Sequence, residues 1–149
     1  MNHQELLDFI RKNPVGFMAS SDRGRPRVRP MTVWLADKTG LYFYTSRLKN
    51  LMMQLLIEPA VEIAFHQPGT PPDPGTLVRV AGRAEFVDDM ATRKRLWELN
   101  PWLEKIGTGT PDNQSIAVFR IPSGEYSLWT WENNIQPGPW LVFPRSAPR

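Results

Sequence analysis

The segment that follows the aromatic run 41–45 carries the residue types of an anion-binding site. Thr45 and Ser46 supply two adjacent hydroxyl groups, and Lys49 supplies a cation three residues later. Apolar spacing over 46–58 predicts a helix that opens at Ser46, where unpaired backbone N–H groups would be exposed. Such N–H groups, hydroxyls and a lysine together can hold a phosphate. Taken alone, however, the spacing favours a simpler explanation, a capping serine and a solvated lysine.

A second candidate is the strand expected over residues 27–35, with the sequence RVRPMTVWL. Alternation places Arg27, Arg29 and Met31 on one face. Two arginines on one face need an anion, a carboxylate or solvent, and alone they favour a solvated barrel face. Pro30 cannot donate a ladder hydrogen bond, so it predicts an edge strand or a bulge.

The tryptophans and histidines give weaker signals. Trp129 and Trp131 lie two residues apart in an expected strand, so we expect them to share a face. Tryptophan is more often core or interface material than a ligand-stacking group. His3 lies near the start of the chain, and His66 follows an apolar strand. His66 is interpreted as a structural or solvent-facing residue, and His3 as inert.

Composition narrows the classes of function. The chain has 149 residues, of which 41% are hydrophobic and 22% charged, which is typical of one globular domain over residues 1–149. Without cysteine there are no disulfides, thiolate metal sites or cysteine nucleophile, and two histidines supply a metal site poorly. A net charge of +3 is small for a nucleic-acid binder. With no long apolar run and no signal-peptide pattern, we expect a cytoplasmic protein that does not enter membranes.

The elements that must position these residues are short and closely spaced. Helices are expected over 4–12, 46–58 and 88–99, and strands over 15–20, 27–35, 41–45, 60–66, 77–87, 115–121 and 125–132. This order favours a small, mostly antiparallel barrel with helices at its ends over a βαβ unit. Gly82 predicts a bulge or a sharp bend, and Asp88 or Asp89 predicts a helix cap. We expect a solvated helix face at residues 93–95 and an extended tail over 133–149.

Four segments together resemble a known family. They are NPVGFMAS, GRPRVRPMTVW, LYFYTSRLKNLMMQLLIEPAVEIAF and LVRVAGRAEFVDD, in this order and spacing. They resemble the pyridoxamine 5'-phosphate oxidase-like FMN-binding split-barrel proteins. Within that superfamily the chain is most similar to the small bacterial nitroimidazole-reductase-like and general-stress-like branch.

This resemblance implies a mostly β fold with peripheral helices, a six-stranded antiparallel split β-barrel. It also implies a homodimer with FMN at the dimer interface. In the family an aromatic-Thr pair lies at a strand end, and a Thr-Ser-x-x-Lys site binds the phosphate. The strand before them runs along the flavin, with an arginine that reaches the phosphate. The resemblance therefore favours the anion site over a simple helix cap. The cofactor-binding residues it implies are Arg27, Arg29, Pro30, Met31, Thr32, Val33, Trp34, Tyr44, Thr45, Ser46 and Lys49.

Departures from the family pattern limit the predicted activity. The tail lacks the Arg-Leu-His-x-Arg pattern of true pyridoxamine phosphate oxidases, which argues against vitamin B6 oxidation, and Leu77 stands where those oxidases have a flavin-contacting glutamine. We predict an FMN-dependent oxidoreductase that acts on a small-molecule substrate or electron donor, with no metal ligands and no assigned catalytic residue. The alternatives are a non-enzymatic flavin-binding or electron-transfer protein, or the same barrel with haem or a deazaflavin.

Overall fold

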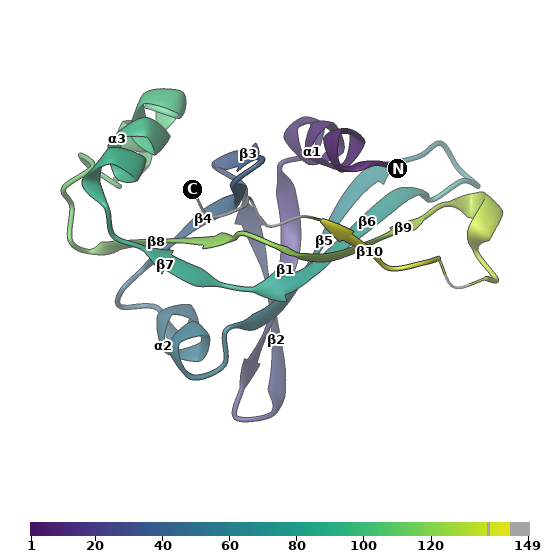
Figure 1. Ribbon diagram of the computed structural model, residues 1–149, viewed down its shortest axis with the longest axis horizontal. Helices are drawn as coiled ribbons and strands as arrows, with labels where there is room; N and C mark the ends of the chain where they lie inside the picture. Colours follow the sequence, from purple (N-terminus) through teal and green to yellow (C-terminus); the bar gives the residue numbers. More distant parts are fainter. Residues whose placement is uncertain (137, 144–149) are drawn as a thin grey trace.

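Antiparallel β-sheet dominates the computed structural model, which describes residues 1–136 and 138–143 (Figure 1). One sheet has the order β10 (Leu141–Phe143), β9 (Gly124–Trp129), β6 (Gly75–Arg83), β5 (Ala60–Pro68), β1 (Val15–Asp22) and β2 (Arg25–Thr32). The other has the order β3 (Leu35–Asp37), β4 (Gly40–Ser46), β8 (Ile116–Ile121) and β7 (Glu85–Val87). The predicted mostly β, antiparallel fold with peripheral helices is confirmed.

Helices lie around the sheets. They are α1 (His3–Lys12), α2 (Asn50–Ile57), α3 (Met90–Leu99) and the short 3-10 helices η1 (Pro101–Ile106) and η2 (Trp131–Asn133). In Figure 1, α1 and α3 lie above the sheets and α2 lies below them, beside the projecting β1–β2 hairpin. The side chain of Asp89 caps α3 by accepting from the backbone N–H of Thr92 at 2.8 Å, as the sequence predicts.

Two facing glycines mark the place where the chain passes between the sheets. Gly82 on β6 lies opposite Gly124 on β9, and β7 continues from β6 into the other sheet after Ala84. A Cβ on Gly124 would lie 2.0 Å from the carbonyl oxygen of Ala81, and one on Gly82 would lie 2.5 Å from Ile121 Cγ2. Because no side chain fits there, these glycines allow the bend that joins the two sheets. The bend predicted from Gly82 therefore lies where the two sheets join.

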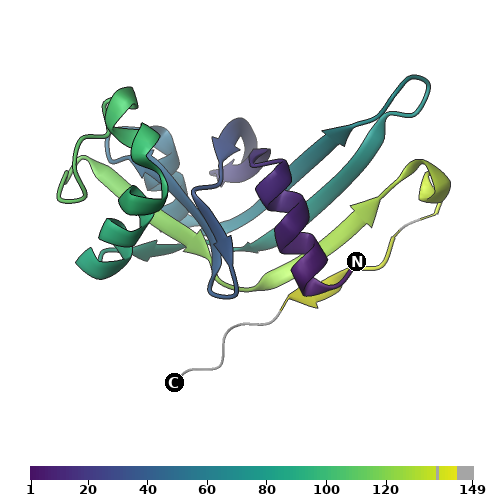
Figure 2. The same cartoon turned by 90° about the horizontal axis from the view of Figure 1, so that it is seen from above.

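The core divides into two parts. The larger cluster fills the space between the sheets and is closed by α1 at one end, where Leu6, Leu7 and Ile10 are buried (Figure 2). The smaller cluster packs α3 against β4 and β8 and includes Trp34, Trp97 and Leu96. Both clusters fix the strands that carry the candidate anion-binding residues.

Four of the expected elements differ from the structure by more than two residues or are divided. The strand expected over 77–87 is divided at Ala84 into β6 and β7, which belong to different sheets. The strand expected over 27–35 is divided at Trp34. The Val33 N–H still follows the hairpin register and bonds the carbonyl of Pro14 at 2.9 Å, but the Trp34 N–H bonds the carbonyl of Tyr42 on β4 at 2.8 Å, and its ring joins the smaller core cluster. The helix expected over 46–58 begins only at Asn50. The strand expected over 125–132 ends at Trp129, and Trp131 opens η2, so these two tryptophans do not share a strand face.

The prediction of a solvated face over residues 93–95 is wrong for Arg93. This side chain is buried and donates to the backbone carbonyls of Pro111, Asn113 and Ile116, at 2.6, 2.8 and 3.0 Å. Its guanidinium also lies 5.4 Å from the centre of the Trp97 ring. Arg93 therefore ties α3 to the loop before β8. Of the tail expected over 133–149, residues 141–143 form β10, and residues 137 and 144–149 lie outside the described residues.

Candidate functional site

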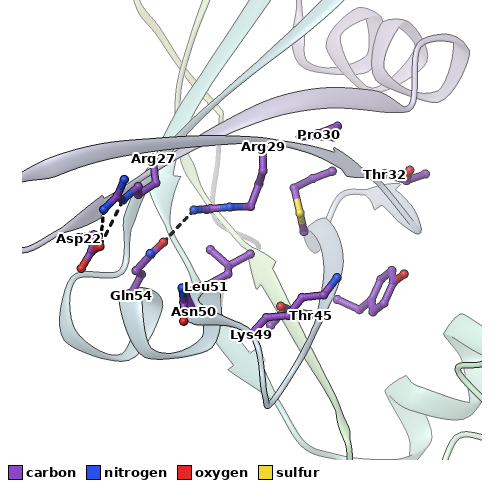
Figure 3. Close-up of a pocket in the computed structure, with 12 residues that line it drawn as sticks. Asp22, Arg27, Arg29, Pro30, Thr32, Thr45, Lys49, Asn50, Leu51 and Gln54 are labelled. Carbon is purple, nitrogen blue, oxygen red and sulfur yellow. Dashed lines mark hydrogen bonds and ion pairs between the residues drawn. The ribbon is translucent and has the colours of Figure 1, made fainter.

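A cleft of about 710 Å³ opens between β2, the end of β4 and the start of α2 (Figure 3). Its lining residues combine cations, small polar groups and apolar side chains. They are Asp22, Arg27, Arg29, Pro30, Met31, Thr32, Tyr44, Thr45, Lys49, Asn50, Leu51 and Gln54. We call it the anion-binding cleft, because its cations outnumber its carboxylate.

Strand β2 supplies one wall of this cleft. It is an edge strand that pairs only with β1, which is where a proline is tolerated, so Pro30 costs no ladder hydrogen bond. The alternation of the strand turns Arg27, Arg29 and Met31 to one side. In Figure 3 the Arg29 side chain points from β2 toward Gln54 on α2, and the Arg27 side chain points toward Asp22. The sequence predicted both features.

The two arginines have different partners. Arg27 forms an ion pair with Asp22, its neighbour across the hairpin turn, at 3.1 Å. Arg29 donates to two uncharged side chains instead, to Ser20 Oγ at 2.8 Å and to Gln54 Oε1 at 2.9 Å. Partial burial, and then the charge of Arg27 nearby, lower the pKa of the Arg29 guanidinium, although it stays protonated at any working pH. Of the two, Arg29 is the one that has no carboxylate partner among residues 1–136 and 138–143.

The opposite wall comes from the connection between β4 and α2. Ser46 remains paired with Ile116 in the sheet, and its hydroxyl accepts from the N–H of Leu48 at 3.2 Å. It therefore ends a strand and stabilises a turn, and the prediction that it caps the helix is wrong. Lys49 has extended backbone angles and occupies the cap position of α2 without a side-chain cap bond.

Lys49 nevertheless lines the cleft. Among the residues that the structure describes, its ammonium group has neither an ion pair nor a hydrogen bond to another side chain. Thr45 beside it is buried, and its hydroxyl makes one long bond of 3.5 Å to the carbonyl of Ser46. An exposed cation and a nearly uncommitted hydroxyl thus lie at the end of β4.

The structure brings most of the predicted cofactor residues together. Those that line the cleft are Arg27, Arg29, Pro30, Met31, Thr32, Tyr44, Thr45 and Lys49. Val33, Trp34 and Ser46 do not line it. Val33 belongs to the larger core cluster, and the Trp34 ring stacks on Tyr44 with 4.3 Å between ring centres.

Four lining residues were not anticipated: Asp22, Asn50, Leu51 and Gln54. Asn50 and Gln54 are four residues apart, which places them on the same side of a helix. This spacing could have indicated that both residues line one site. It was missed because a helix predicted to start at Ser46 places Lys49, and not Asn50, in the first turn. Asp22 was interpreted only as part of a turn, and its pairing with Arg27 depends on the hairpin register.

A second pocket, of about 740 Å³, lies on the opposite face of the larger sheet. Its strand residues include Phe17, His66, Leu77, Arg79 and Trp129. The His66 Nε2 atom is 2.8 Å from the carbonyl oxygen of Pro74, which agrees with a structural role. Within the described part of the chain, no three acidic, histidine or cysteine side chains gather to hold a metal, and no helix is long and apolar enough to cross a membrane.

Solved structures with the same fold differ in the ligands that their descriptions name. A NimC/NimA family protein from Clostridium acetobutylicum has a TM-score of 0.76 and 22% identity, over 95% of this chain and 90% of that one. A FAD-binding protein from Mesorhizobium loti has a TM-score of 0.70 and 20% identity, over 86% and 94%. HutZ, a haem storage protein from Vibrio cholerae, has a TM-score of 0.67 and 18% identity, over 85% and 92%.

The sequence comparison with families is more specific than these structural likenesses. None of the curated proteins matches the chain. The family model of pyridoxamine 5'-phosphate oxidase matches residues 3–128, a range that contains every residue of the anion-binding cleft. Since that match runs from the start of α1 into β9, the chain belongs to the pyridoxamine 5'-phosphate oxidase family.

Proposed function

We propose that this protein binds FMN, with the phosphate in the anion-binding cleft, and that it is a flavin-dependent oxidoreductase for a small molecule. The observation that carries the proposal is the pair formed by Arg29 and Lys49. These cations line one cleft from opposite walls, and neither is offset by a carboxylate among the described residues. Two cations of this kind can bind a phosphate monoester through charge-assisted hydrogen bonds.

The groups in the cleft suit a flavin mononucleotide. Arg29, Lys49 and the Thr45 hydroxyl would hold the phosphate by charge and hydrogen bonds. Apolar side chains such as Met31 and Leu51 line the same cleft and would contact less polar parts of the cofactor. The volume of about 710 Å³ lies in the usual range for sites of this kind. The cleft has one cluster of residues that can hold a phosphate, and FAD has two phosphates. We therefore propose FMN over FAD.

We also propose a homodimer. The face of the larger sheet that carries the second pocket exposes Val15, Phe17 and Val28, with about half or more of each side chain accessible. The edge of β2 is also unpaired in the single chain. Exposed apolar residues next to a free strand edge are typical of an interface, and twofold symmetry would cover both at once.

When bound, the flavin would supply the redox chemistry of the reaction. The residues of this chain would bind its phosphate, orient it and exclude water. The carboxylate of the cleft, Asp22, is already paired with Arg27, so we assign no acid or base to the reaction. A flavin-binding protein without enzymatic activity would have the same cleft, and reoxidation of the reduced protein with and without candidate acceptors separates the two.

Haem is the main competing cofactor, because one structurally similar protein is a haem storage protein. Neither histidine lines the anion-binding cleft, which favours the flavin there. The test is the visible absorption spectrum of the purified protein, followed by mass spectrometry of the released ligand. A flavin spectrum and the mass of FMN are expected. A Soret band, or the mass of FAD or of a deazaflavin, would contradict the proposal.

A further inference from the structure

Uncharged side chains hold Arg29 in place. The Ser20 hydroxyl donates to Gln54 Oε1 at 2.7 Å, and Arg29 donates to both of these oxygens. The three side chains therefore form a closed ring of hydrogen bonds between β1, β2 and α2. Ser20 and Gln54 are each only 6% exposed, so packing fixes them and little water competes for their oxygens.

Gln54 is an unexpected residue for its position in the helix. It lies on the inner side of α2 with Leu51 and Leu55, where a third leucine would pack without any polar group to satisfy. What the glutamine adds is an acceptor for Arg29 and Ser20. A glutamate of the same length would accept the same bonds, but its charge would offset that of the arginine.

The neighbouring arginine shows the alternative arrangement. Arg27 is held by the carboxylate of Asp22, so its charge is already balanced. On the same side of the same strand, one arginine is paired with an acid and the other with neutral acceptors. Of these two guanidinium groups, only that of Arg29 is held in place without a paired carboxylate among the described residues.

We infer that Gln54, together with Ser20, is a positioning residue that fixes Arg29 toward the cleft without neutralising it. Because the guanidinium is already ordered, binding an anion costs less side-chain entropy. The inference rests on the proposed function, since the anion in question is the phosphate of FMN. Gln54 itself need not touch the cofactor.

Two substitutions separate the two parts of this role. Gln54→Leu removes the acceptor and should raise the Kd for FMN about three- to tenfold. Gln54→Glu keeps the acceptor but adds a charge, and it should raise the Kd roughly ten- to hundredfold. Gln67→Glu changes the net charge equally at an exposed site on β5 outside the cleft, and it should bind like the parent.

Riboflavin binding and a double variant distinguish a positioning role of Gln54 from a general loss of structure. Riboflavin lacks the phosphate, so its Kd should stay the same in both Gln54 variants. In the Arg29→Ala background, Gln54→Leu should have no further effect on FMN binding. Thermal melts without ligand show whether each variant folds. Should Gln54→Glu not fold, Ser20→Ala takes its place and should raise the Kd for FMN two- to fivefold.

Titration with FMN and with inorganic phosphate distinguishes the possible failures. Parent-like FMN affinity in Gln54→Leu and Gln54→Glu overturns the positioning role and leaves the FMN proposal intact. An equal loss of riboflavin affinity also overturns it, because the effect would then be structural. If the parent binds phosphate but not FMN, the flavin proposal fails, and the same variants judge the positioning role with phosphate. A parent that binds neither overturns both.

Discussion

Arg27 donates to Asp22 through both Nε and Nη2, at 3.2 and 3.1 Å, and both bonds end on the same carboxylate oxygen. Asp22 is paired with Arg25 across the hairpin turn at Arg23 and Gly24, which have positive φ angles, and Arg27 lies two residues further along β2, diagonally opposite Asp22. This pairing makes two arginines on one strand face unequal. One is already matched by an acid, and the other, Arg29, is not.

The first prediction concerns that inequality. Arg29→Ala should raise the Kd for FMN roughly ten- to hundredfold, because a charge-assisted bond to phosphate is lost. Arg27→Ala should change it less than about threefold, because Asp22 already holds the Arg27 guanidinium, and the carboxylate that remains is exposed enough for solvent to screen its charge. Fluorescence titration of both variants, beside thermal melts, makes the comparison. An equal or larger loss in Arg27→Ala would show that Asp22 does not hold Arg27 away from the ligand.

The second prediction concerns Lys49. Its side chain is exposed and makes no hydrogen bond to another side chain of the described residues. Lys49→Ala should therefore change the free energy of unfolding by no more than about 0.5 kcal/mol. Against a phosphate the same change should cost about 1.5–3 kcal/mol, a ten- to hundredfold rise in Kd.

The control for Lys49 is Lys94→Ala on the exposed side of α3, which should bind FMN like the parent. Arg95 would serve less well, because it is paired with Asp37 at 2.9 Å. If Lys49→Ala and Lys94→Ala bind FMN equally well, the phosphate does not lie at the start of α2.

The third prediction tests the buried arginine of α3. Arg93→Leu should lower the free energy of unfolding by about 3 kcal/mol or more, because three backbone carbonyls lose a charged donor. Urea unfolding of the variant beside Lys94→Ala measures the difference. A loss below about 0.5 kcal/mol would mean that Arg93 contributes no more than a solvated side chain.

The fourth prediction concerns the exposed face of the larger sheet. Val28→Glu should convert the proposed dimer into a monomer, because it places a charge where two apolar faces would meet. Light scattering should return twice the chain mass for the parent and one chain mass for the variant. Ile106→Glu, at a similarly exposed position in η1, should stay dimeric. A monomeric parent at micromolar concentration contradicts the dimer outright.

The sequence predicted the local structure correctly at positions where the residue type allows few conformations or roles. Pro30 indicated an edge strand, Gly82 the bend between sheets, and Asp89 the cap of α3, because each of these residues permits few alternatives. The start of α2 was missed, because the pairing of Ser46 with Ile116 is a long-range contact that outweighs its preference for a helix cap.

The parts of the candidate site that depend on local spacing were also predictable. The spacing of Arg27 and Arg29 on a strand was sufficient to place them on one face. The burial of Arg93 was not predictable, because its acceptors come from a loop 18 to 23 residues away. Gln54 was missed because its role depends on Ser20 and Arg29, which are distant in sequence and adjacent only after folding.

The most direct test of the FMN site is a fluorescence titration of the parent protein with FMN, riboflavin and FAD under the same conditions. The phosphate should account for most of the affinity. FMN should therefore bind at least tenfold more tightly than riboflavin, which lacks it, and more tightly than FAD, whose second phosphate has no matching group in the cleft. Equal affinity for FMN and riboflavin would contradict a phosphate site formed by Arg29 and Lys49.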